Sequence, residues 1–172
     1  VGRNLPPAPH PLRLNSSLYG SLLDDPAFEP DNAQTINVIN QLLCGLVELS
    51  PELDIAPSLA QRWEISPDGR HYVFSLRYDA RWSDGAPLTA EDFEYSWKRA
   101  IHPAMKDTYA EFFFDIQGAR AYHQGQLQDA SQVGVRALDR YTLAVDLEEP
   151  VGHFLYLAAY PVLFPLPKHI VE

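Results

Sequence analysis

Proline most constrains how this chain can fold, because the 172-residue sequence contains 15 prolines spread along its length. Proline lacks a backbone N–H donor and disfavours a helical residue before it, so it ends helices and avoids central strands. Many of the prolines stand at the edges of apolar runs: Pro26, Pro30, Pro51, Pro57, Pro67, Pro87, Pro103, Pro150 and Pro161. The sequence therefore predicts many short elements with sharp joints, in an α+β fold built mainly from antiparallel hairpins.

Two segments have the pattern of a β-hairpin. The stretch SPDG (66–69) is a strong turn signal, because its proline fixes φ and its glycine closes the turn. It separates QRWEI (61–65) from HYVFSLR (71–77), where apolar and polar residues alternate as in a strand. VGVRALDRYTLAVDL (133–147) predicts a second pair of strands that turns about Asp139.

Apolar spacing predicts several helices. One runs from about Ala33 to near Gly45, a second, short helix opens at Pro57 and holds Leu59 and Ala60, and residues 108–124 form two pieces parted at Gly118. A short apolar helix is expected in GHFLYLAAY (152–160), followed by an extended, proline-interrupted segment to residue 172. The apolar face expected for the first helix consists of Ile36, Ile39, Leu42, Leu43, Leu46 and Val47.

The stretch RWSDGAPLTAEDFEYSWKRA (81–100) has the residues of an active site and also those of a helix start. Asp84 and Gly85 predict a turn, and Thr89 followed by Asp92 resembles a capping box, with Asp in place of Glu or Gln. The apolar residues of the expected helix, which recur on one face, are Phe93, Trp97, Ala100 and Ile101. We favour turn capping by Asp84 over a catalytic carboxylate, and core burial of Trp82 over ligand stacking.

Charge and motif spacing exclude several classes of function. Thirteen basic against 23 acidic residues give a formal net charge of −10, which argues against nucleic-acid binding. The six histidines are widely spaced, and the single cysteine, Cys44, lies in an apolar run where an inert buried thiol is expected. No nucleophile elbow or nucleotide-binding glycine motif is present. We therefore predict no catalytic residue, no metal site and no cofactor, with surface or capping roles for the histidines.

An aromatic stretch gives a mild signal of binding. FFFD (112–115) places three aromatic rings at successive helical positions, so they cannot all enter one core. At least one ring must face another segment, a ligand or a partner. Tyr109 stands just before this stretch and is a plausible ligand-facing phenol.

Residues 56–100, APSLAQRWEISPDGRHYVFSLRYDARWSDGAPLTAEDFEYSWKRA, closely resemble the signature region of the family 5 extracellular solute-binding proteins. The matching pieces follow in order: P-x-L-A-x-x-W, then S-x-D-G-x-x-Y-x-F-x-L-R, then A-x-W-S-D-G-x-P-L-T-A-x-D-F-x-Y-S-W-x-R. Segments 133–155 and 24–49 match the family's later hairpin and helix and its N-terminal loop and helix. The family comprises oligopeptide-, dipeptide- and nickel-binding receptors of ABC importers, and the chain looks most similar to the oligopeptide receptors.

The resemblance implies a domain organisation. Family members have two lobes that close on ligand, often with an extra domain, and are considerably longer than this chain. The chain is accordingly expected to be an N-terminal portion without the second lobe. Residues 1–45 would form the first segment of lobe I, residues 46–165 an inserted smaller domain, and residues 166–172 the return toward lobe I.

The resemblance also implies ligand contacts. In oligopeptide-binding relatives the loop before the first helix adds its backbone to the bound peptide as a strand, and here that loop is Asp31, Asn32 and Ala33. Such β-augmentation is indifferent to side-chain identity, which suits a receptor for varied peptides. The tyrosine that faces the peptide in these relatives corresponds to Tyr109 in DTYAEF.

The expected function is that of a periplasmic or extracytoplasmic, non-enzymatic receptor, peripheral to the membrane, which delivers oligopeptides to ABC permease subunits. A lipid anchor on the precursor is left open. A receptor of the same fold could instead bind a dipeptide, a nickel chelate or an oligosaccharide. Two hypotheses from different classes are an enzyme with hidden paired acids such as Asp84 and Asp92, and a standalone interaction module. The apolar stretch 154–167 is expected to be partly exposed in this chain and to favour a dimer or poor solubility.

Overall fold

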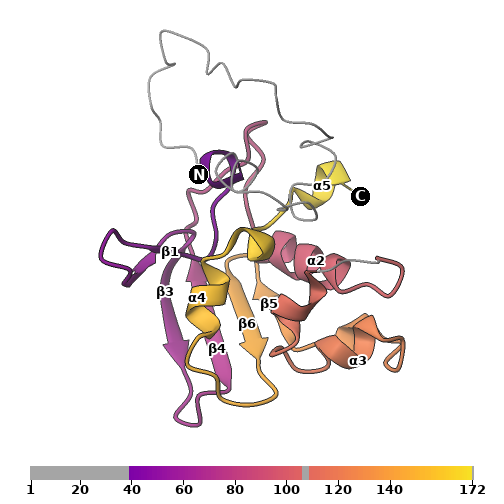
Figure 1. The fold of residues 1–172 in the computed structure, drawn as a ribbon. Coiled ribbons are helices and arrows are strands. Elements are labelled where there is room, and N and C mark those ends of the chain that lie inside the picture. The colour runs from indigo at the N-terminus through magenta and orange to yellow at the C-terminus, as the bar shows by residue number, and fades with distance from the viewer. Residues whose placement is uncertain (1–38, 106–108, 172) are drawn as a thin grey trace, which may run out of the picture.

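The computed structural model describes residues 39–105 and 109–171, in which a four-stranded antiparallel sheet has the order β3-β4-β6-β5 (Figure 1). A separate antiparallel pair, β1 and β2, precedes this sheet in sequence. The strands are β1 (Val47–Leu49), β2 (Ile55–Pro57), β3 (Ala60–Ile65), β4 (His71–Leu76), β5 (Val135–Asp139) and β6 (Thr142–Asp146). This arrangement confirms the expected α+β fold of antiparallel hairpins.

Short helices connect and cover the strands. They are α2 (Ala90–Ala100), η1 (Ala110–Phe113), α3 (Ala119–His123), η2 (Ala130–Gln132), α4 (Phe154–Ala158), η3 (Pro161–Leu163) and α5 (Lys168–Val171). In the view of Figure 1, α2 and α3 lie to the right of the sheet and α4 lies in front of it. None of the described helices is long and apolar enough to span a bilayer.

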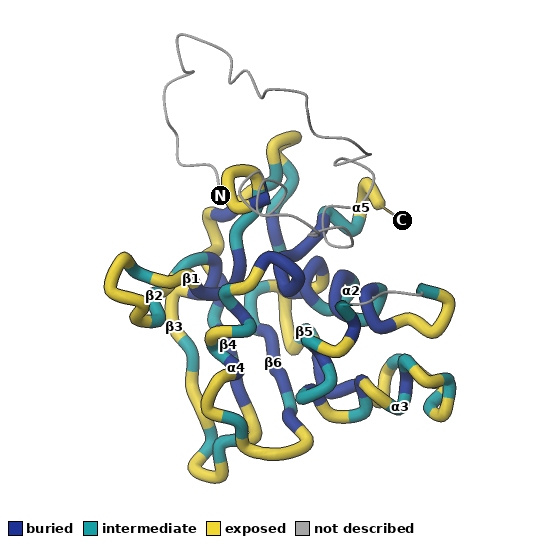
Figure 2. Tube along the Cα trace, in the orientation of Figure 1, coloured by how far each residue is buried: buried dark blue, intermediate teal, exposed yellow. Residues whose placement is uncertain are grey.

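The sheet has one buried and one solvent-facing side because residues alternate along its strands. Tyr72, Phe74 and Leu76 on β4 are buried, and Phe74 lies opposite Leu143 of β6. The ring of Tyr72 lies 4.9 Å from that of Phe154 on α4, so this helix covers the buried side. Figure 2 shows burial concentrated along β6 and the inner side of α2, with exposed residues at the hairpin tips. Both predicted hairpins are confirmed, including the SPDG turn, where Gly69 has a φ of +71°.

Helix α2 begins and ends as the sequence predicts. The backbone N–H of Thr89 donates to Asp92 Oδ2 at 2.8 Å, which satisfies a free donor at the start of the helix. The predicted apolar face is buried without exception: Phe93, Trp97, Ala100 and Ile101. The helix therefore anchors the sheet through this face and ends before Pro103.

Three predictions about local structure are wrong. Pro57 ends strand β2 instead of opening a helix, because the neighbouring residues pair as strands. The first helix ends earlier than expected: its described residues are 39–42, Leu42 is 55% exposed, and Val47 belongs to β1. Residues 161–171 are not wholly extended, since they contain η3 and α5.

The apolar stretch 154–167 is mostly buried, and the partial exposure expected for it is limited to a few residues. Residues 161–166 are all buried, and Phe154 and Ala158 on α4 are 1% and 0% exposed. Tyr156 and Tyr160 remain the exposed members, at 50% and 37%. The stretch therefore completes the core of the described residues, and the apolar patch behind the predicted dimer is largely absent from their surface.

Candidate functional site

The 3-10 helix η1 separates two aromatic rings that are adjacent in sequence. A 3-10 helix turns three residues per turn, so successive side chains point about 120° apart and residues i and i+3 eclipse each other. Phe113 is 1% exposed and contacts Trp97 edge-on, with ring centroids 6.0 Å apart. Tyr109 and Phe112 stand three residues apart and share the other side, with ring centroids 6.1 Å apart. The buried ring of Phe113 thus fixes where Tyr109 and Phe112 point.

A third ring, from a distant segment, completes this group. Tyr160 follows α4, and its ring stacks on that of Phe112 with a centroid distance of 5.3 Å and an interplanar angle of 3°. Tyr160 is 37% exposed and Phe112 is half-buried, so the group reaches the surface. We call Tyr109, Phe112 and Tyr160 the aromatic row. Aromatic rings offer a ligand a large apolar contact area, and the two tyrosine hydroxyls of the row add polar groups that can form hydrogen bonds.

A hollow of about 370 Å³ adjoins the aromatic row at Tyr160. Its wall includes Asn40 of the first helix, Cys44 and Gly45 just after that helix, and the ring of Phe164. A side-chain carbon on Gly45 would come within 2.6 Å of that ring, so the backbone can approach here only with glycine. Cys44 is half-buried and lines the hollow, so the prediction of a buried thiol is only partly met.

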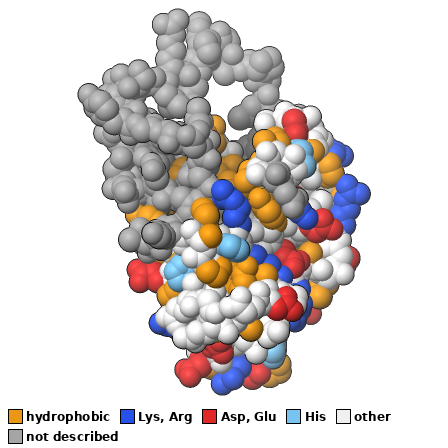
Figure 3. All heavy atoms as spheres, turned by 90° about the vertical axis from the view of Figure 1, so that its right-hand side faces the viewer, with side chains coloured by type: hydrophobic (Ala, Val, Ile, Leu, Met, Phe, Trp, Pro, Cys, Tyr) orange, Lys and Arg blue, Asp and Glu red, His pale blue; other side chains and the backbone are white. Residues whose placement is uncertain are grey.

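A larger cavity of about 740 Å³ lies on the outer side of α2, on the face that Figure 3 turns toward the viewer. Basic, acidic and aromatic side chains line it, among them Tyr95, Lys98 and Tyr122. Lys98 Nζ contacts Glu94 Oε1 at 2.5 Å, and Glu94 Oε2 accepts the backbone N–H of Ala137 at 2.7 Å. The carboxylate of Glu94 therefore ties α2 to β5, which is a structural use.

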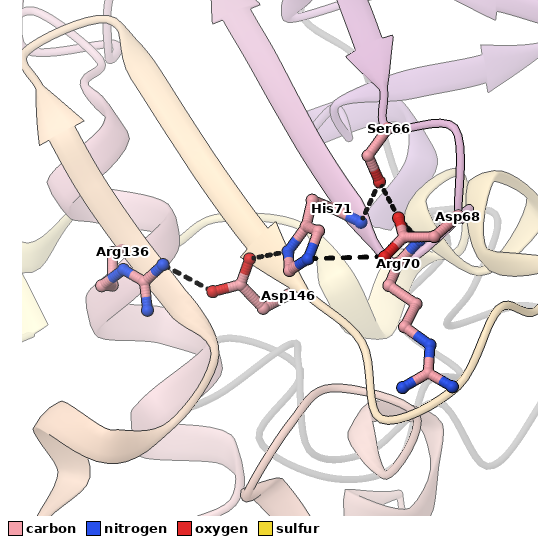
Figure 4. A network of polar contacts seen from close by, with 6 residues as sticks. All are labelled: Ser66, Asp68, Arg70, His71, Arg136 and Asp146. Carbon is pink, nitrogen blue, oxygen red and sulfur yellow. Dashed lines mark hydrogen bonds and ion pairs between the residues drawn. The ribbon is translucent and has the colours of Figure 1, made fainter.

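A polar network lies on the solvent-facing side of the sheet (Figure 4). His71 Nδ1 lies 2.7 Å from Asp146 Oδ1 directly across β4 and β6, and Arg136 donates to the other oxygen of that carboxylate. Ser66 contacts Asp68 in the neighbouring turn, and this hydrogen bond is the main cause that lowers the pKa of Asp68. These are exposed cross-strand and turn contacts, which stabilise a sheet surface modestly.

The residues weighed as catalytic candidates have structural partners. Asp84 Oδ1 accepts the backbone N–H of Ala86 at 2.9 Å, as expected for a turn cap, and Asp84 Oδ2 lies 2.6 Å from His169 Nε2. The hydrogen bond from His169, followed by that from Ala86, lowers the pKa of Asp84. Trp82 is half-buried beside α2 and donates to Asp92 Oδ2 at 3.3 Å. These contacts favour a turn cap over catalysis for Asp84, and packing in the fold over ligand stacking for Trp82.

The histidines take surface or capping positions in the described residues, as predicted. His71, His102, His153 and His169 are exposed, and His123 Nδ1 lies 3.3 Å from the carbonyl oxygen of Ile101. Within residues 39–105 and 109–171, no three His, Cys, Asp or Glu side chains gather as a metal site would require. His10 lies outside these ranges.

The sequence predicts two members of the aromatic row: Tyr109 as an individual residue, and Phe112 as part of the FFFD run. The sequence singles out Tyr109 directly, and FFFD correctly indicates that one of its rings faces another segment. Tyr160 is missed because nothing local marks it: it stands 48 positions beyond Phe112 and is recognised only by its stack. The predicted contacts Asp31, Asn32 and Ala33 lie outside the described residues.

Comparison with known proteins identifies the family. The model of the bacterial extracellular solute-binding proteins, family 5 Middle, matches residues 54–171. The chain is 39% identical to the probable deoxycholate-binding periplasmic protein YgiS of Escherichia coli K12, over 99% of this chain and 32% of that protein. It is 37% identical to the periplasmic oligopeptide-binding protein OppA of the same strain, over 79% of this chain and 25% of that protein.

A solved structure gives the same result. Listeria monocytogenes OppA bound to peptide superposes with a TM-score of 0.82 at 36% identity, over 86% of this chain and 29% of that one. The chain spans about a quarter to a third of the length of these relatives. The family is one of solute-binding receptors and not of enzymes, in agreement with the prediction from sequence. This chain belongs to the family 5 bacterial extracellular solute-binding proteins.

Proposed function

We propose that this chain is part of an extracytoplasmic receptor that binds oligopeptides and delivers them to ABC permease subunits. The observation that carries the proposal is the aromatic row at the surface, which contains Tyr109, within a family whose relatives include peptide-binding proteins. Binding would shift an equilibrium between open and closed lobes, and the closed state would engage the permease. The periplasmic names of the bacterial relatives support an extracytoplasmic location.

The receptor would bind the peptide through two kinds of contact. The backbone of Asp31, Asn32 and Ala33 would add a strand to the peptide, and hydrogen bonds along the main chain are independent of peptide sequence. The phenol of Tyr109 would face the peptide, and stacking of Phe112 on Tyr160 would hold it in place. Sequence tolerance would come from the first contact and a preference for apolar or aromatic side chains from the second.

The proposed domain organisation is the one expected from the family: 1–45 and 166–172 in lobe I, and 46–165 as a smaller inserted domain. Support comes from the core, since one continuous buried cluster runs from Leu46 to Leu163. The second lobe would complete the ligand site.

A second candidate ligand is an amphiphilic steroid acid. The specific observation is 39% identity to a probable deoxycholate-binding protein along almost the whole chain. A rigid apolar ligand could also lie on the aromatic row, but it has no extended backbone to pair with residues 31–33. The two candidates therefore differ in whether that loop contributes.

Isothermal titration of the receptor expressed from the complete reading frame around residues 1–172 tests the proposal. Mixed tri- to pentapeptides are expected to bind and deoxycholate is not. Binding of deoxycholate without peptide binding would favour the second candidate. Tight binding of a nickel chelate or a sugar, without peptide binding, would indicate that the chain belongs to another branch of the family.

A further inference from the structure

Two polar side chains are buried on the core-facing side of α2. Within residues 39–105 and 109–171, Asp92 and Ser96 are the polar or charged residues that are almost fully buried, at 5% and 6% exposure. They stand four residues apart, so they lie one turn apart on one side of the helix. Burying a carboxylate is costly unless hydrogen bonds compensate it. The hydrogen-bond partners of Asp92 and Ser96 therefore indicate the role of these two side chains.

The two carboxylate oxygens of Asp92 accept hydrogen bonds from two different parts of the chain. Oδ2 accepts the backbone N–H of Thr89 at 2.8 Å and the indole N–H of Trp82 at 3.3 Å, which are contacts at the start of α2. Oδ1 instead accepts the backbone N–H of Lys168 at 3.1 Å, 76 positions along the chain. Capping of α2 explains the first oxygen and leaves the second without a role in the helix.

Ser96 and Trp97 contact the same distant segment. The hydroxyl of Ser96 donates to the carbonyl of Asp92 at 2.6 Å and accepts the backbone N–H of Leu166 at 2.7 Å. The indole N–H of Trp97 donates to the carbonyl of Leu163 at 2.8 Å. Three side chains of α2 thus meet backbone atoms of residues 163, 166 and 168.

The C-terminal segment, residues 163–168, belongs to neither sheet of the described chain. It runs from the last residue of η3 to the first residue of α5, and residues 163–166 are buried. Leu163 and Phe164 donate to the carbonyl oxygens of Tyr160 and Pro161, and Pro165 has no N–H, so Leu166 carries the buried N–H that needs a partner from another element. An unpaired buried donor would cost about 1–3 kcal/mol. The side chains on α2 therefore supply what a neighbouring strand would supply in a sheet.

We propose that Asp92, Ser96 and Trp97 are positioning residues that fix the C-terminal segment to the sheet domain through its backbone. Because the contacts are made to main-chain atoms, they set the path of the segment whatever its side chains are. The pair of Asp84 and His169 lies just beyond and forms an exposed second attachment. In the receptor proposed above, and resting on that proposal, the domain would move as one body with the chain up to Lys168.

Amide hydrogen exchange of the 172-residue chain, followed residue by residue by NMR, tests the positioning role without any ligand. In Ser96→Ala the amide of Leu166 is expected to exchange about tenfold faster, which is the loss of one hydrogen bond. In Asp92→Asn a single carbonyl must serve both Thr89 and Lys168, so the amide of Lys168 is expected to exchange faster. Amides of β4 and β6 should keep their rates in both variants.

Glu91→Gln is the matched control, because it makes the same chemical change as Asp92→Asn at an exposed neighbouring position. It should leave both amides unchanged. Equal acceleration of Leu166, Lys168 and the strand amides would reduce the effect to general destabilisation and overturn the proposal. Unchanged exchange of Leu166 in Ser96→Ala would also overturn it, and this variant decides the matter if Asp92→Asn does not fold.

Discussion

Two aromatic clusters meet at η1, and they differ in how far their rings are buried. Phe113 and Trp97 are each 1% exposed and belong to the core, whereas Phe112 stacks on Tyr160, which is 37% exposed. The centroid spacings are similar, at 6.0 Å and 5.3 Å, although the first pair meets edge-on and the second is stacked. One step of about 120° around a 3-10 helix therefore separates a ring in the core from a ring in a group that reaches the surface.

The comparison teaches that one aromatic run can place one ring in the core and the next ring at the surface when a short helix lies at the edge of the core. A closed cluster contributes mainly through the apolar area it removes from water. An open row leaves part of that area exposed, so we expect its members to contribute less to stability and, in the proposed receptor, more to binding. Substitutions within and around the two clusters can separate these contributions.

The largest expected effect is on stability. Phe113→Ala should lower the free energy of unfolding by about 3–5 kcal/mol, because it leaves a cavity against Trp97. Phe112→Ala should lower it by only about 1–2 kcal/mol, since that ring is only half-buried. Urea unfolding of the two variants measures both values. Equal losses would show that the row is as much part of the core as Phe113.

A smaller effect is expected where the hollow beside Tyr160 meets the core. Gly45→Ala would place a carbon 2.6 Å from the ring of Phe164 and 2.7 Å from the carbonyl oxygen of Ala158. We expect a loss of about 1–3 kcal/mol in the free energy of unfolding, because this contact must be relieved by shifting packed atoms.

Gly152→Ala is its control, since nothing lies within 4 Å of a carbon added there. Thermal unfolding should show a change of less than about 1 kcal/mol in this variant. An equally small change in the free energy of unfolding of Gly45→Ala would show that the wall of the hollow adjusts to an added carbon. The packing at Gly45 would then not differ from that of an open surface.

Ligand binding should respond in the opposite order to stability. In the complete receptor, Tyr109→Ala or Phe112→Ala should weaken peptide binding by about 1–2 kcal/mol, because each removes part of the aromatic row. Phe114→Ala removes the third ring of FFFD, which lies against His123 and Arg120 instead. Titration calorimetry should show unchanged affinity for this control. Loss of affinity in Phe114→Ala alone would place the ligand on the other side of η1.

The smallest expected effect is a loss of stability at low pH. It should affect the polar pair of Asp84 and His169 near α5 and leave the aromatic clusters unchanged. The hydrogen bond from His169, then that from Ala86, lowers the pKa of Asp84 below its ordinary value of 3.8. Its contribution to stability is therefore present above 3.8 and lost as the pH falls through the lowered value. The aromatic contacts contain no carboxylate and should persist.

Unfolding curves of the wild-type chain and Asp84→Asn, recorded from neutral pH to below the ordinary pKa of 3.8, measure this contribution. The difference between the two should be small and should vanish at the acid end, because Asp84 is exposed. A difference that grows as the pH falls would contradict the assigned direction of the shift.

Local sequence determined the elements whose signals lie within a few residues. The SPDG turn and its alternating flanks form the β3–β4 hairpin, and the four apolar residues of α2 are all buried behind the Thr89 and Asp92 cap. Family membership was also evident, because its motifs follow in order along the chain. These features depend on backbone preference and periodicity, which act over one turn or one strand.

Tertiary structure alone decided the features that join distant segments. Pairing with β1 made Pro57 the end of a strand, and pairing with β4 made Ala60 the start of the next one, where the sequence predicted a short helix that opens at Pro57. Phe112 stacks on Tyr160, and Asp92 accepts the backbone N–H of Lys168, only because the folded chain brings these distant residues within contact distance. The physical reason is that burial and hydrogen-bond satisfaction are properties of the whole packed domain, so no local pattern marks which residues will supply them.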